Sequence, residues 1–104
     1  MILTNIDNVP GKAIKVHYGL VCGSTVRSKN AFKDFGTGIK SMFGGELKSY
    51  THLMDETRNE ALSRMSKQAQ ELGANAVVNL RFATSDVAPG AAEIYVYGTA
   101  VTVE

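Results

Sequence analysis

One helical pattern dominates this chain and runs from about Leu47 to Leu72. Apolar side chains recur there at helical spacing, while polar side chains fill the remaining positions. A helix of about 26 residues is roughly 39 Å long, whereas a compact globule of 104 residues has a diameter of about 33 Å. The helix is therefore longer than the domain that must cover it. Its apolar stripe consists of Met54, Arg58, Ala61, Leu62, Met65, Ala69 and Leu72, and Gly73 is placed to end it.

Alternating apolar and polar residues on both sides of this helix predict a small sheet. The strand before the helix is long, and Gly19 and Gly23 are the positions where we expect it to bend or bulge. We expect a loop from Ser85 to Gly90, with the strands on either side of it paired as an antiparallel hairpin. The predicted fold is a single α+β domain over residues 1–104, in which the long helix packs on one face of a twisted sheet. Strands are expected at residues 1–4, 13–26, 76–82 and 93–103.

A second, shorter helical pattern lies between the long strand and the long helix. Its five apolar residues fall on one stripe, although two glycines among them weaken a helix by up to ~1 kcal/mol each. The pattern predicts a short amphipathic helix with Phe32, Phe35, Ile39, Met42 and Phe43 on its apolar side.

The last strand is apolar on both of its faces. Ile94 and Val96 belong to one face, and Tyr95 and Tyr97 belong to the other. One helix covers only one face of a sheet, so the second face needs another partner. Together with the long helix, this pattern predicts that copies of the chain associate as a homo-oligomer.

Charge and cysteine content exclude several classes of partner. Eleven Lys and Arg against ten Asp and Glu give a formal net charge of +1, too little to hold a nucleic acid or an anionic membrane. The single cysteine, Cys22, forms no intramolecular disulfide and belongs to no CxxC motif. With no apolar run long enough for a signal peptide or a membrane span, we expect a cytoplasmic protein.

Three residues are candidate ligands for a divalent transition metal. His17 and Cys22 share a strand but point to opposite faces if the strand is regular, and a bulge at Gly19 would reverse that phase. In the simpler alternative, Cys22 is a core residue and His17 a surface residue. His52 has Asp55 and Glu56 one turn further along the helix, a spacing that suits a weak cation site or a solvated helix face. In a ring, symmetry copies of one side chain would supply several ligands.

Two arginines fall where the pattern expects apolar residues. Arg58 lies on the helix stripe and needs a partner, for which Glu93 and Asp86 are the candidates. Arg81 shares with Asn79 the strand face opposite Val78, Leu80 and Phe82, and it would lie at an interface if a second copy covered that face. At such an interface the arginines would either form salt bridges between subunits or bind a small anionic ligand. The lining residues of that site would be Tyr50, Arg58, Arg81 and Glu93.

Several short segments occur in an order and spacing that match a known family over nearly the whole chain. The segments are Gly44–Leu47, Tyr50-Thr51, Arg58 with Ala61, Arg64-Met65, Gly73–Val78, Arg81-Phe82 and Tyr97–Val101. In this combination the chain resembles the YbjQ-like family of small bacterial proteins. The resemblance implies α+β subunits that assemble into rings, commonly pentamers or a multiple, and it implies a heavy-metal-binding role.

These patterns support three classes of function. The strongest is a ring-forming homo-oligomeric binding or scaffold protein whose ligand the sequence does not identify. The second is a heavy-metal-binding protein with a site shared between subunits. The third is an enzyme with an active site between subunits, although no nucleophile with an associated His and carboxylate stands out.

Overall fold

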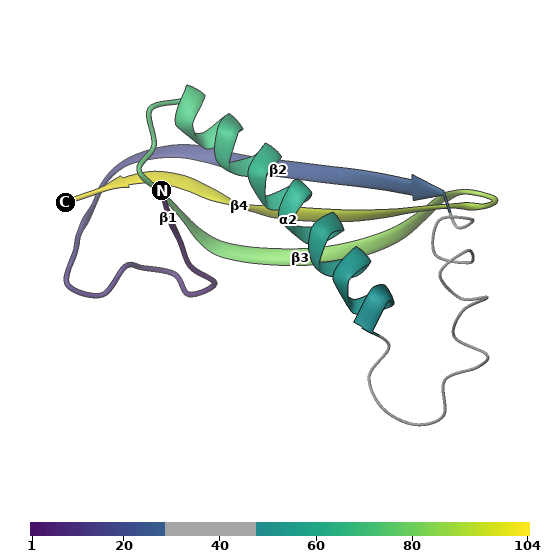
Figure 1. Ribbon diagram of the computed structural model, residues 1–104. Coiled ribbons are helices and arrows are strands. Elements are labelled where there is room, and N and C mark those ends of the chain that lie inside the picture. The colour runs from purple at the N-terminus through teal and green to yellow at the C-terminus, as the bar shows by residue number, and fades with distance from the viewer. Residues whose placement is uncertain (29–47) are drawn as a thin grey trace.

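The computed structural model describes residues 1–28 and 48–104 of the chain. Within these residues the strands form a four-stranded sheet in the order β1-β3-β4-β2, and α2 crosses one face of this sheet diagonally (Figure 1). The chain is therefore an α+β fold of two layers, as the pattern predicts. The expected stripe from Phe32 to Phe43 lies outside the described residues. The elements are β1 (Ile2–Leu3), β2 (Ile14–Ser28), α2 (Lys48–Glu71), β3 (Ala76–Ala88) and β4 (Ala91–Val103).

The central strand β4 is antiparallel to both β2 and β3, whereas the short β1 runs parallel to β3. The expected hairpin is confirmed, but its loop is shorter than the sequence suggests. β3 continues to Ala88, which pairs with Ala91, and the chain turns at Pro89 and Gly90. The polar residues from Ser85 onward stay in the sheet because pairing with β4 outweighs their low strand propensity.

The long helix begins and ends within one residue of its predicted bounds, and Gly73 follows it at φ +94°. The residues that the helix buries differ from the predicted stripe, since Leu72 is 46% exposed and the polar Thr57 is fully buried. Buried positions recur every fourth residue, which is the line that a helix presents when it crosses strands at an angle. This line consists of Leu53, Thr57, Ala61, Met65 and Ala69.

Gly23 marks the point where α2 lies directly on β2. A Cβ at this position would lie 2.2 Å from the carbonyl oxygen of Ala61 and 2.5 Å from the backbone nitrogen of Met65. No real Cβ atom approaches backbone so closely, so the crossing requires glycine. The main core forms around it from Val21, Ala61, Met65, Ala69, Ala74, Val77, Val96 and Ala100.

Four register shifts, two in β2 and two in β3, change which residues face which side of the sheet, and those at Gly19 and Asn79 affect the candidate residues. In β2 the pairing with β4 shifts between His17 and Gly19, and Gly19 has φ +102°. This confirms the expected bulge at Gly19. In β3 the pairing shifts between Val78 and Arg81, and Asn79 between them has φ +54°. Asn79 is the residue in this position because asparagine tolerates the left-handed region better than other residues with a Cβ.

The left-handed backbone at Asn79 gives a testable prediction. We expect Asn79→Val to lower the unfolding free energy by about 1–2 kcal/mol, because a β-branched side chain is disfavoured at positive φ. Asn79→Gly should leave it within about 0.5 kcal/mol, since glycine adopts this conformation freely. Urea denaturation followed by circular dichroism measures both, and equal midpoints for the two variants would contradict the assigned backbone.

Candidate functional site

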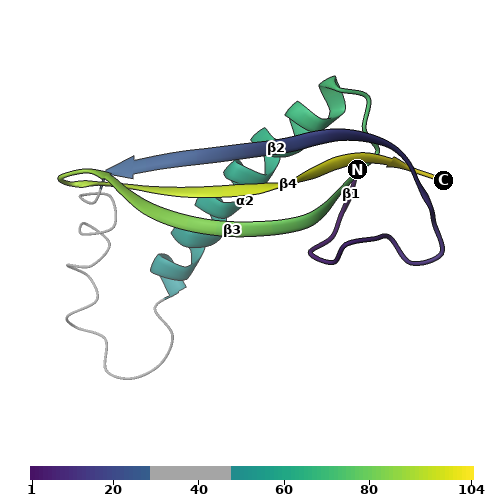
Figure 2. The same ribbon diagram turned by 180° about the vertical axis from the view of Figure 1, so that it is seen from behind.

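The sheet has one face under α2 and one face on the other side, which we call the open face. Figure 2 shows this side of the sheet, with α2 behind it. None of the helices in the described part of the chain covers it. Because side chains alternate along a strand and cross-strand partners share a face, the register assigns residues to it. Tyr97 and its partners Cys22 and Arg81 belong to the open face, as do Val26 and Ser85 opposite Glu93.

The bulge at Gly19 brings His17 and Cys22 to the same face. His17 pairs with Val101 and Cys22 pairs with Tyr97, and these two partners are four residues apart on β4. The expectation of opposite faces, made for a regular strand, is therefore wrong, and the bulged alternative holds. Four residues of strand still separate the two side chains by about 13 Å, which is too far to bind one ion within one copy.

Cys22 is exposed and is not a core residue as the simpler alternative proposed. It faces outward because Val21 and Gly23, on either side of it, are the residues that face α2. His52 is exposed at the start of α2, and its neighbour Asp55 forms an ion pair with Arg58. Residues 1–28 and 48–104 contain no group of three or more His, Cys, Asp or Glu side chains that could hold a metal ion.

Three of the ligand-lining candidates, Arg58, Arg81 and Glu93, do not meet within one copy. Arg58 is paired with Asp55 at 2.5 Å, so neither expected partner, Glu93 or Asp86, holds it. It lies on α2, on the opposite side of the sheet from Arg81 and Glu93. Tyr50 lies in the first turn of α2. An anionic ligand bound by both arginines would have to lie between two copies.

Arg81 also corrects the predicted face of β3. The bulge at Asn79 places Arg81 on the same face as Val78, since their partners Tyr97 and Thr99 are two residues apart on β4. The Arg81 guanidinium donates to the backbone carbonyl of Asn5 at 2.6 Å. It thus holds the N-terminal segment against β3. Glu93 accepts a hydrogen bond from Ser85 at 3.2 Å. Along β4 it lies four positions, about 13 Å, from Tyr97, which is the cross-strand partner of Arg81.

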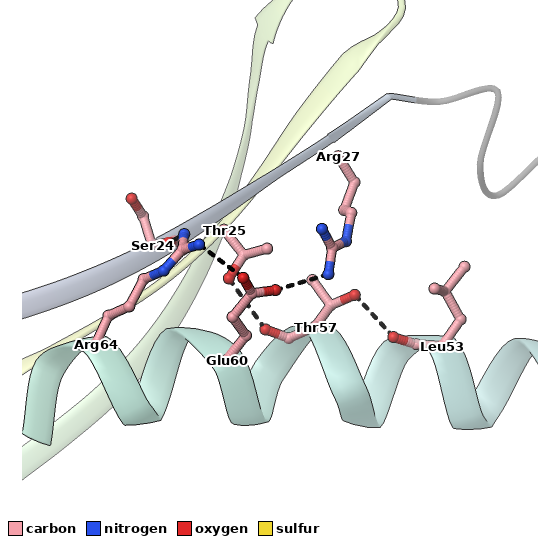
Figure 3. A network of polar contacts seen from close by, with 7 residues as sticks. All are labelled: Ser24, Thr25, Arg27, Leu53, Thr57, Glu60 and Arg64. Atoms are coloured by element: carbon pink, nitrogen blue, oxygen red, sulfur yellow. Dashed lines mark hydrogen bonds and ion pairs between the residues drawn. The ribbon is translucent and has the colours of Figure 1, made fainter.

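A network of polar contacts fixes α2 on β2, as Figure 3 shows. The carboxylate of Glu60 accepts from Arg27 of β2 at 2.7 Å and from Arg64 of α2 at 2.6 Å. Beneath it, the buried hydroxyl of Thr25 donates to the carbonyl of Thr57 at 3.3 Å. The favourable order of Glu60 and Arg64 is visible in the sequence, whereas the contribution of Arg27 requires the fold.

The same helix also covers the middle of the β2 edge. The backbone N–H of Cys22 donates to the side-chain oxygen of Gln68 at 2.8 Å. The Arg64 guanidinium donates to the carbonyl of Ser24. Backbone groups that an additional strand would use are therefore occupied by side chains of α2. Sequence reasoning missed Gln68, because its position among exposed polar residues carries no sign of this role.

The fold and this face define a class of small α+β protein in which, over residues 1–28 and 48–104, one diagonal helix lies on one side of a four-stranded sheet. The chain belongs to the YbjQ-like family, whose profile matches residues 1–104 and is described as "Putative heavy-metal-binding". The resemblance found in the sequence is confirmed. A UPF0145 protein of Hahella chejuensis is 60% identical over 104 residues, and the alignment covers 100% of both chains. A UPF0145 protein of Clostridium novyi is 52% identical over 103 residues, with 99% of each chain covered.

A solved structure supports the fold independently. The crystal structure of a protein of unknown function in the DUF74 family, from Pediococcus pentosaceus, matches with a TM-score of 0.59 and 18% sequence identity. The match covers 100% of this chain and 98% of that one. At this identity the likeness concerns the fold alone. In the described part of the chain, α2 is too polar to cross a membrane, and no other helix qualifies.

Proposed function

We propose that the chain is the subunit of a closed homo-oligomeric ring that serves as a binding or scaffold protein. The observation that carries this proposal is the open face, where Leu20 is 72% exposed and Val26 52% exposed in a single copy. Apolar side chains this exposed on one side of a long sheet favour association. The ring size that fits the family resemblance is a pentamer or a multiple of one.

The shape of the subunit supports the same proposal. Its principal extents are 53 × 30 × 17 Å, so one dimension is about three times another. Among residues 1–28 and 48–104, one diagonal helix leaves much of such a flat sheet without cover on either side. Association with further copies removes that surface from water at roughly 25 cal/mol per Å² of apolar area.

Native mass spectrometry and light scattering test the assembly. We expect a single species whose mass is a multiple of 11.2 kDa at micromolar concentration. A species of about 11 kDa under these conditions would overturn the proposal. Both measurements use the full chain in buffer without added metal.

A second candidate function is binding of a heavy metal at a site shared between subunits. The observation in its favour is that His17 and Cys22 lie on the same open face. Their separation leaves any one copy short of the three or four ligands that a tight transition-metal site needs. The ion would therefore take His17 or Cys22 from more than one copy.

This arrangement predicts an unusual stoichiometry. We expect Zn²⁺, Cu²⁺ or Ni²⁺ to bind at a fraction of one ion per chain, as a site shared by several copies gives. Cys22→Ser should abolish such binding if Cys22 is a ligand, while the oligomer mass stays unchanged because serine fits the same space. Titration calorimetry and native mass spectrometry measure the two quantities. A tight site at one ion per chain, lost in Cys22→Ser, would favour metal binding within a single subunit.

A further inference from the structure

The N-terminal segment runs beside β3 and covers one end of the open face; we call residues 1–9 the strap. From Ala13 onward the chain is fixed in the sheet, because Ala13 and Glu104 exchange two backbone hydrogen bonds at 2.9 and 3.0 Å. Between the strap and this pair the chain turns at Pro10 and Gly11, and Gly11 has φ +80°. Proline followed by glycine at positive φ is typical of a tight turn. The strap is thus joined to the sheet through one turn.

Three consecutive residues of β3 donate hydrogen bonds to three consecutive carbonyls of the strap. The backbone N–H groups of Asn79 and Leu80 both take part, although consecutive N–H groups of a regular strand point to opposite edges. Both reach the strap because the backbone at Asn79 leaves the regular strand conformation, with φ +54°. The irregular backbone of β3 therefore forms the binding site of the strap. The pairs are Asn79 with Ile6 at 2.9 Å, Leu80 with Thr4 at 3.1 Å and the Arg81 guanidinium with Asn5 at 2.6 Å.

Little apolar surface of the strap itself is buried. Val9 is the one buried side chain among residues 1–9, and Ile6 is 45% exposed. Segments with few buried apolar contacts open at a lower free energy than the core of the same protein. The side chains that Val9 covers are, in contrast, each at most 2% exposed when the strap is in place. We call them the second core; they are Ala76, Val78, Val101 and Val103.

We propose that the strap opens and closes as one unit about the turn that precedes Ala13, with Arg81 as its latch. Opening breaks the contacts of the strap and leaves β2 paired with β4, since the hydrogen bonds of Ala13 lie beyond the turn. The open form uncovers the second core and frees the N–H groups of Asn79 and Leu80 at the edge of β3. The strap is thus a conformational switch between a covered and an uncovered end of the sheet. It acts within one copy and does not depend on the ring.

Two features give Arg81 the role of latch. Its guanidinium donates to the carbonyl of Asn5, which lies between the two carbonyls that the β3 backbone binds. A hydrogen bond from a charged donor is stronger than one between neutral groups. It is also the one contact of the three that a side chain makes, so a substitution at Arg81 removes this contact and retains the two backbone donors.

Native-state hydrogen exchange of the full chain, followed residue by residue by NMR, tests the opening. We expect the amide protons of Thr4, Asn79 and Leu80 to exchange at least about tenfold faster than those of Val21 and Val96, which are buried in the main core. The three should share one protection factor to within about threefold, because one opening event exposes all of them. Exchange of the three at the rate of the core amides would mean that the strap opens only when the protein unfolds, and would overturn the proposal. Unequal protection would indicate fraying from the N-terminus and would overturn it as well.

Arg81→Met tests the latch, since methionine keeps an unbranched side chain and removes the donors. We expect the amides bonded to the strap to exchange a further threefold or more faster, about the effect of one charged hydrogen bond at an exposed site, with Val21 unchanged. Arg58→Met is the matched control, because the Arg58 guanidinium pairs with Asp55 on α2, and it should leave all of these rates as they are. Equal acceleration at the strap and at Val21, or none at either, would contradict the role of Arg81 as latch. Far-ultraviolet circular dichroism verifies folding, and Arg81→Ala serves as a replacement if Arg81→Met does not fold.

Discussion

Replacing Gly23 with alanine is expected to lower the unfolding free energy by about 3 kcal/mol or more, at the upper end of what overpacking costs. The added Cβ would lie 2.2 Å from the carbonyl oxygen of Ala61 and 2.5 Å from the backbone nitrogen of Met65. Both neighbours are backbone atoms of a helix, so no side-chain rotation relieves the clash. The helix as a whole would have to move away from β2.

Urea denaturation of Gly23→Ala and of the unchanged protein measures this loss of unfolding free energy. Ser24→Ala is the matched control, because Ser24 is the next residue on the strand and uses its backbone carbonyl, which alanine retains, to bind Arg64. We expect the control to change the unfolding free energy by less than about 0.5 kcal/mol. A Gly23→Ala variant with the midpoint of the control would mean that α2 does not rest on this residue.

The displacement of α2 in Gly23→Ala has a second consequence. Gln68 and Arg64 reach the β2 edge only because the helix lies close to the strand. When the helix moves outward, the N–H of Cys22 loses its acceptor and becomes available to other chains. Gly23 therefore links the packing of the core to the protection of the edge.

Much of the fold could be predicted from the sequence, because periodicity records which side of an element meets the core. The 3.6-residue period located α2 and the 2-residue period located β2 and β4, each to within a few residues. Gly73 ended the helix as expected, at φ +94°. Patterns of this kind involve residues close together in the chain, so a single sequence is enough to detect them.

The errors arose where the backbone departs from a regular period. The bulge at Asn79 reverses the face of Arg81, and nothing in the letters around Asn79 distinguishes a bulge from regular strand. The bulge at Gly19 was one of two alternatives, and the structure selects it. A shift of one residue exchanges the two faces, so one irregular position misplaces every side chain that follows it.

The candidate site depended on which polar side chains pair with one another, and periodicity does not record this. Arg58 found its partner in Asp55, three residues away, rather than in the hairpin. Arg27 and Glu60 meet across two elements, and Thr57 is buried although it is polar, because the hydroxyl donates to the carbonyl of Leu53 at 2.7 Å. The pairing of Arg27 with Glu60 follows from the crossing angle of α2, which the sequence alone does not specify. Asp55 and Leu53, in contrast, lie within one helical turn of the residues that they contact.

Met65→Asp is expected to abolish folding of the protein. Met65 is fully buried at the centre of the main core, where it packs among residues of α2, β2 and β4. Truncation of a buried methionine costs about 2–5 kcal/mol, and an unpaired carboxylate in the same place adds the cost of its lost hydration. Since domains of this size are stable by only about 5–15 kcal/mol, the sum removes most or all of the folded population.

Far-ultraviolet circular dichroism and thermal denaturation measure this outcome. Met65→Leu keeps the volume and the apolar character and should change the unfolding free energy by less than about 1.5 kcal/mol. Ser63→Asp introduces the same carboxylate on the exposed side of α2 and should remain folded with nearly unchanged stability. If Met65→Asp melts at the temperature of Ser63→Asp, α2 does not bury this side chain, and the assigned contact between the helix and the sheet is wrong.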